Sequence, residues 1–285
     1  MRALVRFLLI LILILGTSAC GVRLAYNHLD WLAMRWVNKQ VTLNPVQEMT
    51  FRDALEDKLA WHCANELPRY APFLNSVAVV LQEDTVTVEQ IEGMGAEVAG
   101  FGQSLVDRAM PSVVRLFASL DDRQVEELLT GIDERNEEFR EKRIEVDQEA
   151  RRSDRIDGMK RSLERFIGST SEAQDQRLEL WADSLLFVAP RMYSHQLQWR
   201  DKLAALLADR HQADTFEPAL TELFQPGGDW PNDFQAVMAI NRQRTLDTLV
   251  DIHASLTPRQ KQRLLARLHS LSRDFQRLSC AADAA

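Results

Sequence analysis

The sequence predicts an all-α protein, either a multi-helix bundle or an elongated array of helical hairpins, without a sheet. Two observations support this fold class. Hydrophobic residues recur at alternating spacings of four and three, which places them along one face of a helix. The clearest such stripe consists of Leu264, Leu268, Leu271, Phe275 and Leu278. The only segment that leans towards β-structure is 85–88, which is too short and has no partner strand.

The chain begins with a segment typical of a secretory signal peptide. Arg2 and Arg6 accompany an unbroken apolar run over 7–15, which is shorter than the roughly 20 residues that a transmembrane helix needs. Small residues then precede Cys20, which resembles the bacterial lipobox, where the cysteine carries lipid and becomes the mature N-terminus. We therefore expect a lipoprotein signal over 1–19 and a lipid on Cys20. Ordinary cleavage that leaves a free thiol is the alternative.

Helix starts share one local pattern, in which a short polar residue is followed three positions later by glutamine. The closest copies are Asn44 with Gln47 and Thr257 with Gln260, and looser copies pair Thr87 with Gln90, Asp121 with Gln124, and Ser171 with Gln174. This is a capping box, in which the polar side chain accepts a bond from an unpaired backbone N–H and the glutamine bonds back to the cap residue. Each pair therefore predicts the first turn of a helix.

A charge-rich stretch over 133–165 predicts one long, solvent-exposed helix stabilised by pairs four residues apart. It divides the mature chain into an N-terminal helical part (20–132), a connector (133–168) and a C-terminal helical part (169–285). A single domain over 20–285 fits the same pattern.

The formal net charge of −8 argues against nucleic acid as a partner, because binding phosphates requires clustered Lys and Arg. The expected partners are the membrane, through the lipid anchor, and a protein or lipid of the cell envelope. The body would face the periplasm, and Gly21 rather than Asp after the lipid cysteine favours the outer membrane. The sequence does not define an oligomeric state.

If Cys20 carries lipid, Cys63 and Cys280 remain as an even pair in an oxidising compartment. A disulfide between them is one interpretation. The other is one buried thiol and one exposed thiol near the C-terminus.

No motif indicates a catalytic or metal site. The six histidines form neither an H-x-x-x-H nor an H-E-x-x-H pair, and no nucleophile elbow or phosphate-binding loop is present. We therefore expect no enzyme activity, no metal, and no cofactor beyond the covalent lipid on Cys20.

Two groups of residues are candidate sites. The first is a polar and aromatic cluster of Asp30, Trp31, Trp61, His62 and Glu66. It could be an acid–base site of a hydrolase, but a buried network that locks two helices together is the favoured interpretation.

The second candidate is a basic helix face that contains Arg151, Arg155 and Arg161. Guanidinium groups on this face could bind phosphate or carboxylate groups of a lipid or an acidic partner. Acidic neighbours favour a solvated face whose charges pair with one another.

Two resemblances accompany these predictions. Leu256-Thr257-x-x-Gln260 is similar to the Leu-Thr-x-x-Gln motif of Spy- and CpxP-like periplasmic proteins, which are helical binders of unfolded chains. Cys20, Tyr26-Asn27, Leu29-Asp30-Trp31-Leu32, Trp61-His62 and Glu66-Leu67-Pro68-x-Tyr70 resemble a family of bacterial lipoproteins known as a domain of unknown function. That resemblance implies an outer-membrane-type lipoprotein with a helical body and brings no activity with it. The expected role is non-enzymatic, in partner binding or envelope assembly, with a Spy-like holdase as the alternative.

Overall fold

The computed structural model describes residues 26–225 and 230–280, and all the regular structure in these ranges is helical. The predicted all-α fold class is therefore confirmed. The expected signal over 1–19 and the lipid on Cys20 lie outside the described residues. In chain order the elements are α3 (Leu29–Val37), α4 (Pro45–Trp61), a π-helical turn η1 (His62–Glu66), α5 (Leu67–Gln82), α6 (Val88–Ala118), α7 (Asp122–Arg143), α8 (Gln148–Ile167), α9 (Glu172–Ser184), α10 (Ala189–Ala208), α11 (Ala213–Leu223), α12 (Asn232–Ala254) and α13 (Pro258–Leu278).

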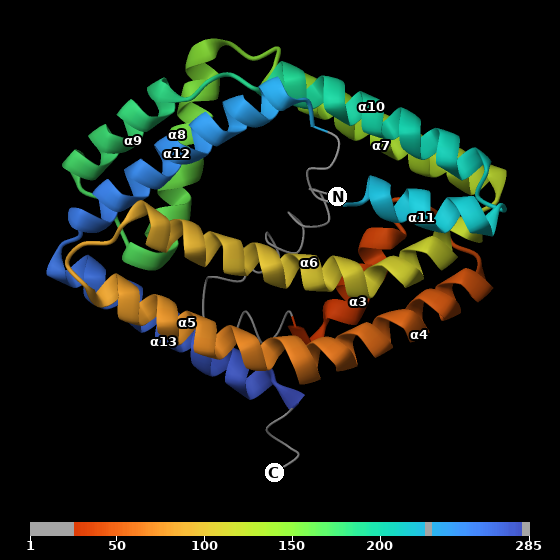
Figure 1. The fold of residues 1–285 in the computed structure, drawn as a ribbon, viewed down its shortest axis with the longest axis horizontal. Coiled ribbons are helices and arrows are strands. Elements are labelled where there is room, and N and C mark those ends of the chain that lie inside the picture. Colours follow the sequence, from red (N-terminus) through yellow and green to blue (C-terminus); the bar gives the residue numbers. More distant parts are fainter. Residues whose placement is uncertain (1–25, 226–229, 281–285) are drawn as a thin grey trace.

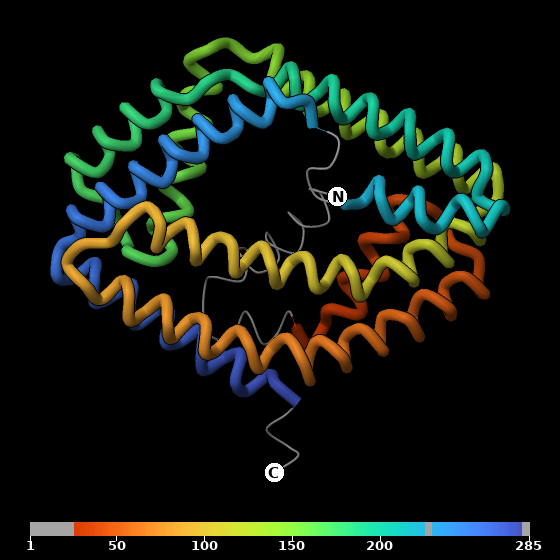
Figure 2. The backbone as a smooth tube through the Cα atoms, viewed as in Figure 1, coloured from red at the N-terminus to blue at the C-terminus, as the bar shows by residue number. Residues whose placement is uncertain are grey.

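Seen along the shortest axis of the molecule, the helices follow an oval outline that α6 crosses (Figure 1). Two long rods form much of this outline. The first is α4–η1–α5, and the second is α9 followed by α10. The N-terminal ends of α4 and α7 meet at one end of the oval, and those of α9 and α13 meet at the other (Figure 2).

The two halves of the chain exchange helices. The second segment of the first rod, α5, packs along α13 from the C-terminal half, and the second segment of the other rod, α10, packs along α7 from the N-terminal half. Two further contacts correspond in the same way, because α4 packs on α6 as α9 packs on α12, and α3 packs on α4 as α8 packs on α9. The fold is thus two similar helical halves, each completed by the other.

Each of the five glutamine patterns forms a capping box at the start of α4, α6, α7, α9 or α13. Local hydrogen bonds therefore fix where these helices begin. Pro45 and Pro258 occupy the first turns of α4 and α13, where a missing N–H has no helical partner to lose.

The turn η1 joins α4 to α5 without a break in helical structure. Pro68 and Pro72 follow it closely, and each removes a backbone donor that an α-helix would use. A π-helical turn re-registers the backbone by one residue and commonly marks a functional position. The prolines thus coincide with a local change in helix register, and the direction of the helix changes there between α4 and α5 (Figure 1).

The expected single charged helix over 133–165 is wrong. The stretch divides into the end of α7 and nearly all of α8, with a turn over 144–147 between them. Asp147 ends this turn by accepting a bond from the backbone N–H of Ala150 at 2.7 Å. The prediction failed because the spacing of charges on a helix face does not show where a helix is interrupted. The cap at Asp147 was also hard to detect, because no glutamine follows it three residues later.

The hydrophobic core has a large cluster and two smaller ones. The large cluster fills the space between α6, α7, α10 and α11, with Leu120, Leu207 and Leu220 almost fully buried. The predicted stripe of α13 contributes to both smaller clusters, with Leu264 and Leu268 in one and Phe275 and Leu278 packed against the other. Within the described ranges, no helix is both long enough and apolar enough to span a bilayer.

Candidate functional site

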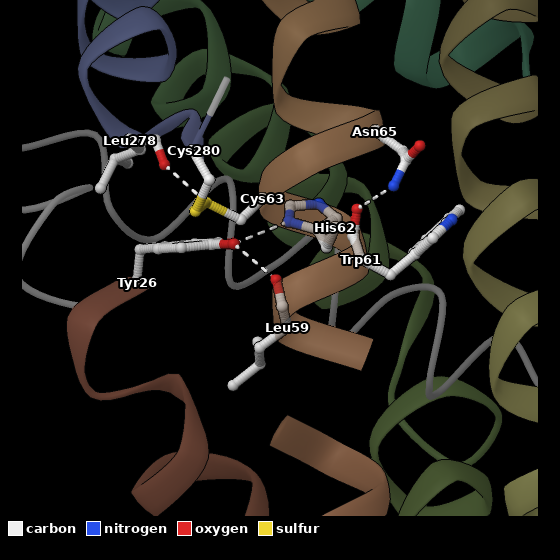
Figure 3. Close-up of a disulfide and its surroundings, with 8 residues drawn as sticks. All are labelled: Tyr26, Leu59, Trp61, His62, Cys63, Asn65, Leu278 and Cys280. Atoms are coloured by element: carbon white, nitrogen blue, oxygen red, sulfur yellow. Dashed lines mark hydrogen bonds between the residues drawn. A yellow bond between two sulfur atoms is a disulfide. The ribbon is translucent and has the colours of Figure 1, made fainter. Parts of the chain in front are cut away.

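A disulfide joins Cys63 in η1 to Cys280 just beyond α13, with the two Cα atoms 5.3 Å apart (Figure 3). Of the two interpretations of these cysteines, the structure contains the bridge. It ties the C-terminal end of the described chain to the middle of the first long rod. His62 and Glu66 of the candidate polar cluster lie in η1 together with Cys63, so the disulfide and the cluster share one corner of the fold.

His62 lies between two tyrosine hydroxyl groups. Its Nδ1 is 3.1 Å from the hydroxyl of Tyr26, and its Nε2 is 3.1 Å from that of Tyr70. A neutral imidazole donates through one nitrogen and accepts through the other, so both of its polar atoms are occupied. Burial lowers the pKa of His62 to about 4, although the charge of Glu66 opposes this shift. At neutral pH the ring is therefore uncharged.

The two tyrosines connect His62 to other parts of the fold. Tyr26 also donates to the backbone oxygen of Leu59 at 3.5 Å (Figure 3), and burial raises its pKa to about 12. Tyr70 packs edge-on against Phe275 and lies 4.9 Å, between ring centroids, from Phe101. The segment before α3 thus contacts His62 directly, and α6 and α13 are joined to it through Tyr70.

Glu66 is the buried charge of this corner, with only 2% of its surface exposed. Its carboxylate accepts bonds from the guanidinium of Arg69 at 2.9 and 3.1 Å and from the hydroxyl of Ser104 at 2.8 Å. Arg69 also lies over the ring of Phe101. A buried carboxylate requires such partners, because an unpaired one would be very costly.

The predicted cluster is therefore only partly assembled. His62 and Glu66 belong to it, whereas Asp30 is exposed on α3 and no hydrogen bond joins it to the described residues of the cluster. Trp61 points away from Tyr26 and the disulfide (Figure 3) and packs under Arg108. Trp31 is 56% exposed and outside the aromatic core.

The sequence reasoning missed Tyr26, Arg69 and Ser104 as hydrogen-bonding members of the cluster. Arg69 had a detectable signal, since a residue three positions after Glu66 lies on the same helix face. Ser104 had none, because the long sequence separation between Glu66 and Ser104 is closed only by the packing of α6.

A second buried polar feature joins the helix starts in pairs. Gln47 and Gln124 each donate a side-chain amide N–H to the other's amide oxygen, at 3.0 and 2.7 Å. Their remaining N–H groups bond to the backbone oxygens of Ser119 and Thr42, and their oxygens accept from the cap residues. Both amides are thus fully satisfied although they are buried.

The same arrangement recurs in the C-terminal half. Gln174 and Gln260 exchange amide bonds at 3.2 and 2.9 Å and bond to the backbone oxygens of Ser255 and Ser169. Gln90 differs, because it is exposed and its bonds stay within its own capping box. The glutamines therefore have a tertiary role in addition to capping, which the sequence pattern alone did not reveal.

The three arginines of the candidate anion-binding face have different surroundings. Arg151 bonds to the backbone oxygens of Ile144 and Val146 and lies 4.5 Å from the ring centroid of Phe187. Burial and the neighbouring charge of Arg151 lower the pKa of Arg155. Arg161 is exposed. The first of these arginines therefore has a structural role at the turn before α8.

The described surface has one hollow between α4 and α6 and another at α11. One of about 100 Å³ lies between α4 and α6 and is lined by Val46, Phe51 and Leu116, among others. A larger hollow, of about 740 Å³, is lined by one side of α11 in the described chain. The described residues include no group of three His, Cys, Asp or Glu side chains that could hold a metal ion.

Fold and site together define an all-α class of protein, made of two similar halves that exchange helices and are joined by buried glutamine pairs. The chain belongs to the family of unknown function DUF6279, which matches residues 39–235. The matched region includes the first glutamine pair and Gln174 but ends before Gln260. Comparison with curated proteins found no match, and comparison with solved structures found none either.

Proposed function

We propose that this protein is a lipid-anchored component of the bacterial cell envelope that faces the periplasm and acts by binding a partner. The anchor is the lipid expected on Cys20, and the outer membrane is the expected location because Gly21 follows that cysteine. The partner is a protein or lipid of the envelope.

The observation that carries the proposal is the disulfide between Cys63 and Cys280. Disulfides persist in oxidising compartments such as the bacterial periplasm and are rare in the cytosol. These two cysteines are the pair that remains once Cys20 carries lipid. The signal-like N-terminus and the paired cysteines therefore support the same compartment by independent routes.

The geometry of the polar cluster supports binding over catalysis. A general acid or base must reach a substrate proton, but both nitrogens of His62 are occupied by tyrosine hydroxyls and the carboxylate of Glu66 by Arg69 and Ser104. The hydrolase alternative also needs Asp30, which is exposed on α3. The cluster instead has the properties of a lock between helices.

The groove between α4 and α6 supports a protein partner. At about 100 Å³ it is smaller than the 300–1,000 Å³ that small-molecule sites usually occupy, but it could receive an apolar side chain. Val46 lines it and is 67% exposed, and Met49, on the next turn of α4, is 60% exposed. Exposed methionines adapt to varied apolar surfaces.

The anchor and the partner surface are tested separately. Mass spectrometry of the mature N-terminal peptide should show acyl groups on Cys20, and Cys20→Ser should release the protein from membranes. A photo-crosslinking residue at position 49 should give reproducible adducts in intact cells. The matched control is position 79, because Val79 on α5 is also strongly exposed, at 64%. An unacylated N-terminus would refute the anchor, and equal adducts at both positions would refute the groove.

A holdase is the second candidate. The observation that favours it is the glutamine-capped helix start at Thr257, which is similar to that of Spy- and CpxP-like proteins. The purified protein should slow the aggregation of a reduced model client, and Met49→Glu should weaken this effect. Aggregation at the unassisted rate would exclude the holdase and leave the binding of an envelope partner.

A further inference from the structure

We propose that the exposed face of α3 lies against the membrane, with Trp31 at the boundary between lipid headgroups and acyl chains. This inference rests on the proposed anchoring through Cys20. The occupant of the surface is a phospholipid bilayer.

The chain between the lipid anchor and the folded body is short. Tyr26 is held to the body through the oxygen of Leu59 and the ring of His62. Only six residues lead from Cys20 to Tyr26, and a chain spans at most about 3.6 Å per residue. Tyr26 must therefore lie within about 22 Å of the acylated cysteine. This corner of the body therefore stays close to the membrane surface, and α3, which begins three residues later, is among the elements held nearest to it.

The outward face of α3 has the composition of a membrane interface. Trp31, Arg35 and Asn38 follow at spacings of four and three and are all exposed, so they share one helix face. The opposite face points inward, with Val37 buried and Trp36 packed against the large core cluster. Trp is enriched at membrane–water interfaces because its ring is apolar and its N–H is polar.

Trp31 is unusual among the tryptophans of this chain. Trp31 has 56% of its surface exposed to solvent, whereas the other five tryptophans are buried or half-buried. The guanidinium of Arg35 lies 5.4 Å from the ring centroid of Trp31, and Lys39 is exposed one turn further on. A cation beside an interfacial aromatic ring can bond to lipid phosphate while its stem remains in apolar surroundings.

The disulfide keeps this surface in place. Cys63 is adjacent to His62, which bonds to Tyr26, so the segment before α3, the first rod and the end of α13 are joined at one corner (Figure 3). The tether therefore joins the body directly at this corner, through a short segment and not through a long linker.

The test is fluorescence quenching by brominated lipid. The acylated full chain is reconstituted into vesicles of phosphatidylethanolamine and phosphatidylglycerol, with or without bromine on the acyl chains. Bromine should quench part of the tryptophan emission, and Trp31→Phe should abolish most of this quenching. Because position 31 is exposed, the variant should unfold at the same temperature as the wild type, which circular dichroism checks.

The matched control restores a tryptophan at a remote exposed position. Leu180 on α9 is 61% exposed, so Trp31→Phe combined with Leu180→Trp should remain unquenched. The inference is overturned if Trp31→Phe retains the quenching or if Leu180→Trp restores it. Mass spectrometry of the same sample reports acylation of Cys20. An acylated but unquenched protein therefore refutes only the docking surface, whereas an unacylated protein refutes the proposed function as well.

Discussion

Gln124 donates its side-chain amide to the amide oxygen of Gln47 at 2.7 Å, although 77 residues separate them. Each glutamine closes the first turn of its own helix, and together they join α4 to α7. Because Gln174 and Gln260 do the same for α9 and α13, local capping and tertiary assembly use the same atoms. Loss of one amide therefore disturbs two helix starts.

Replacement of Gln124 should be much more costly than replacement of Gln90. Gln124→Ala removes the cap bond and leaves the buried side-chain amide of Gln47 without its partner, which together cost about 2–3 kcal/mol. Gln90 has the same capping box without a tertiary partner, so Gln90→Ala should cost at most about 1 kcal/mol. Urea denaturation measures both. Equal losses would show that the pair adds nothing beyond capping.

The disulfide should stabilise the fold substantially. Cys63 and Cys280 close a loop across 217 positions of the sequence, and removal of a native disulfide typically costs about 2–5 kcal/mol. Cys280→Ser should lower the melting temperature and remove the mobility difference between reduced and non-reduced gels. Cys63→Ser should give the same result, since either change breaks the same bond. Identical migration of the oxidised and reduced wild type would contradict the bridge.

Acidification should destabilise the protein through His62. Its pKa is about 4 in the fold against 6.5 for the unperturbed group, so between these values the unfolded chain binds a proton that the folded chain does not. Stability therefore falls as the pH drops from about 6.5 to about 4, and the full difference corresponds to about 3 kcal/mol. Unfolding at a series of pH values measures this effect.

The control for this pH dependence is a second histidine. His62→Phe should flatten the fall in stability between pH 6.5 and 4, whereas His211→Gln, at an exposed position, should retain it. If His62→Phe has the same slope as the wild type, another group is responsible. Glu66, Tyr26 and Tyr70 are the titratable groups that face the ring or influence its charge.

Arg210 should be far more important than a surface arginine. Its buried guanidinium donates to the backbone oxygens of Leu120 at 2.7 Å and Leu207 at 2.8 Å. Arg210→Met leaves both oxygens without this donor and should cost about 2–3 kcal/mol. Arg200, which pairs with Asp133 nearer the surface, should lose about 0–1 kcal/mol on replacement by Met. Thermal unfolding of the two variants provides the comparison.

The fold class and the helix starts could be predicted from the sequence because both depend on local order. Apolar spacing defines a helix face, and a capping box lies within four residues. The exchange of α5 and α10 between the halves could not be predicted, since it depends on which apolar faces meet in space. The stripe at Leu264 and Leu268 shows that α13 buries a face but does not identify α5 as its partner.

The candidate site was predictable to a similar extent. The spacing of His62 and Glu66 indicated a common helix face, but their actual partners come from three other parts of the chain. Ser104 carries no pattern that distinguishes it from other polar residues, and Tyr26 and Tyr70 stood out only as parts of the family resemblance. Asp30 was assigned to the cluster by its neighbourhood in sequence, and its outward position depends on the packing of α3, with Val37 directed inward.

The exchange of α5 and α10 has a consequence for any chain that carries only one half. Such a polypeptide would present the second segment of its long rod with no neighbour to cover it, and its own last helix would lack the matching surface. Two copies could satisfy both needs by associating about a two-fold axis, with the last helix of each covering the second rod segment of the other. The present protein accordingly has the organisation of a symmetric homodimer whose subunits have been fused into one polypeptide.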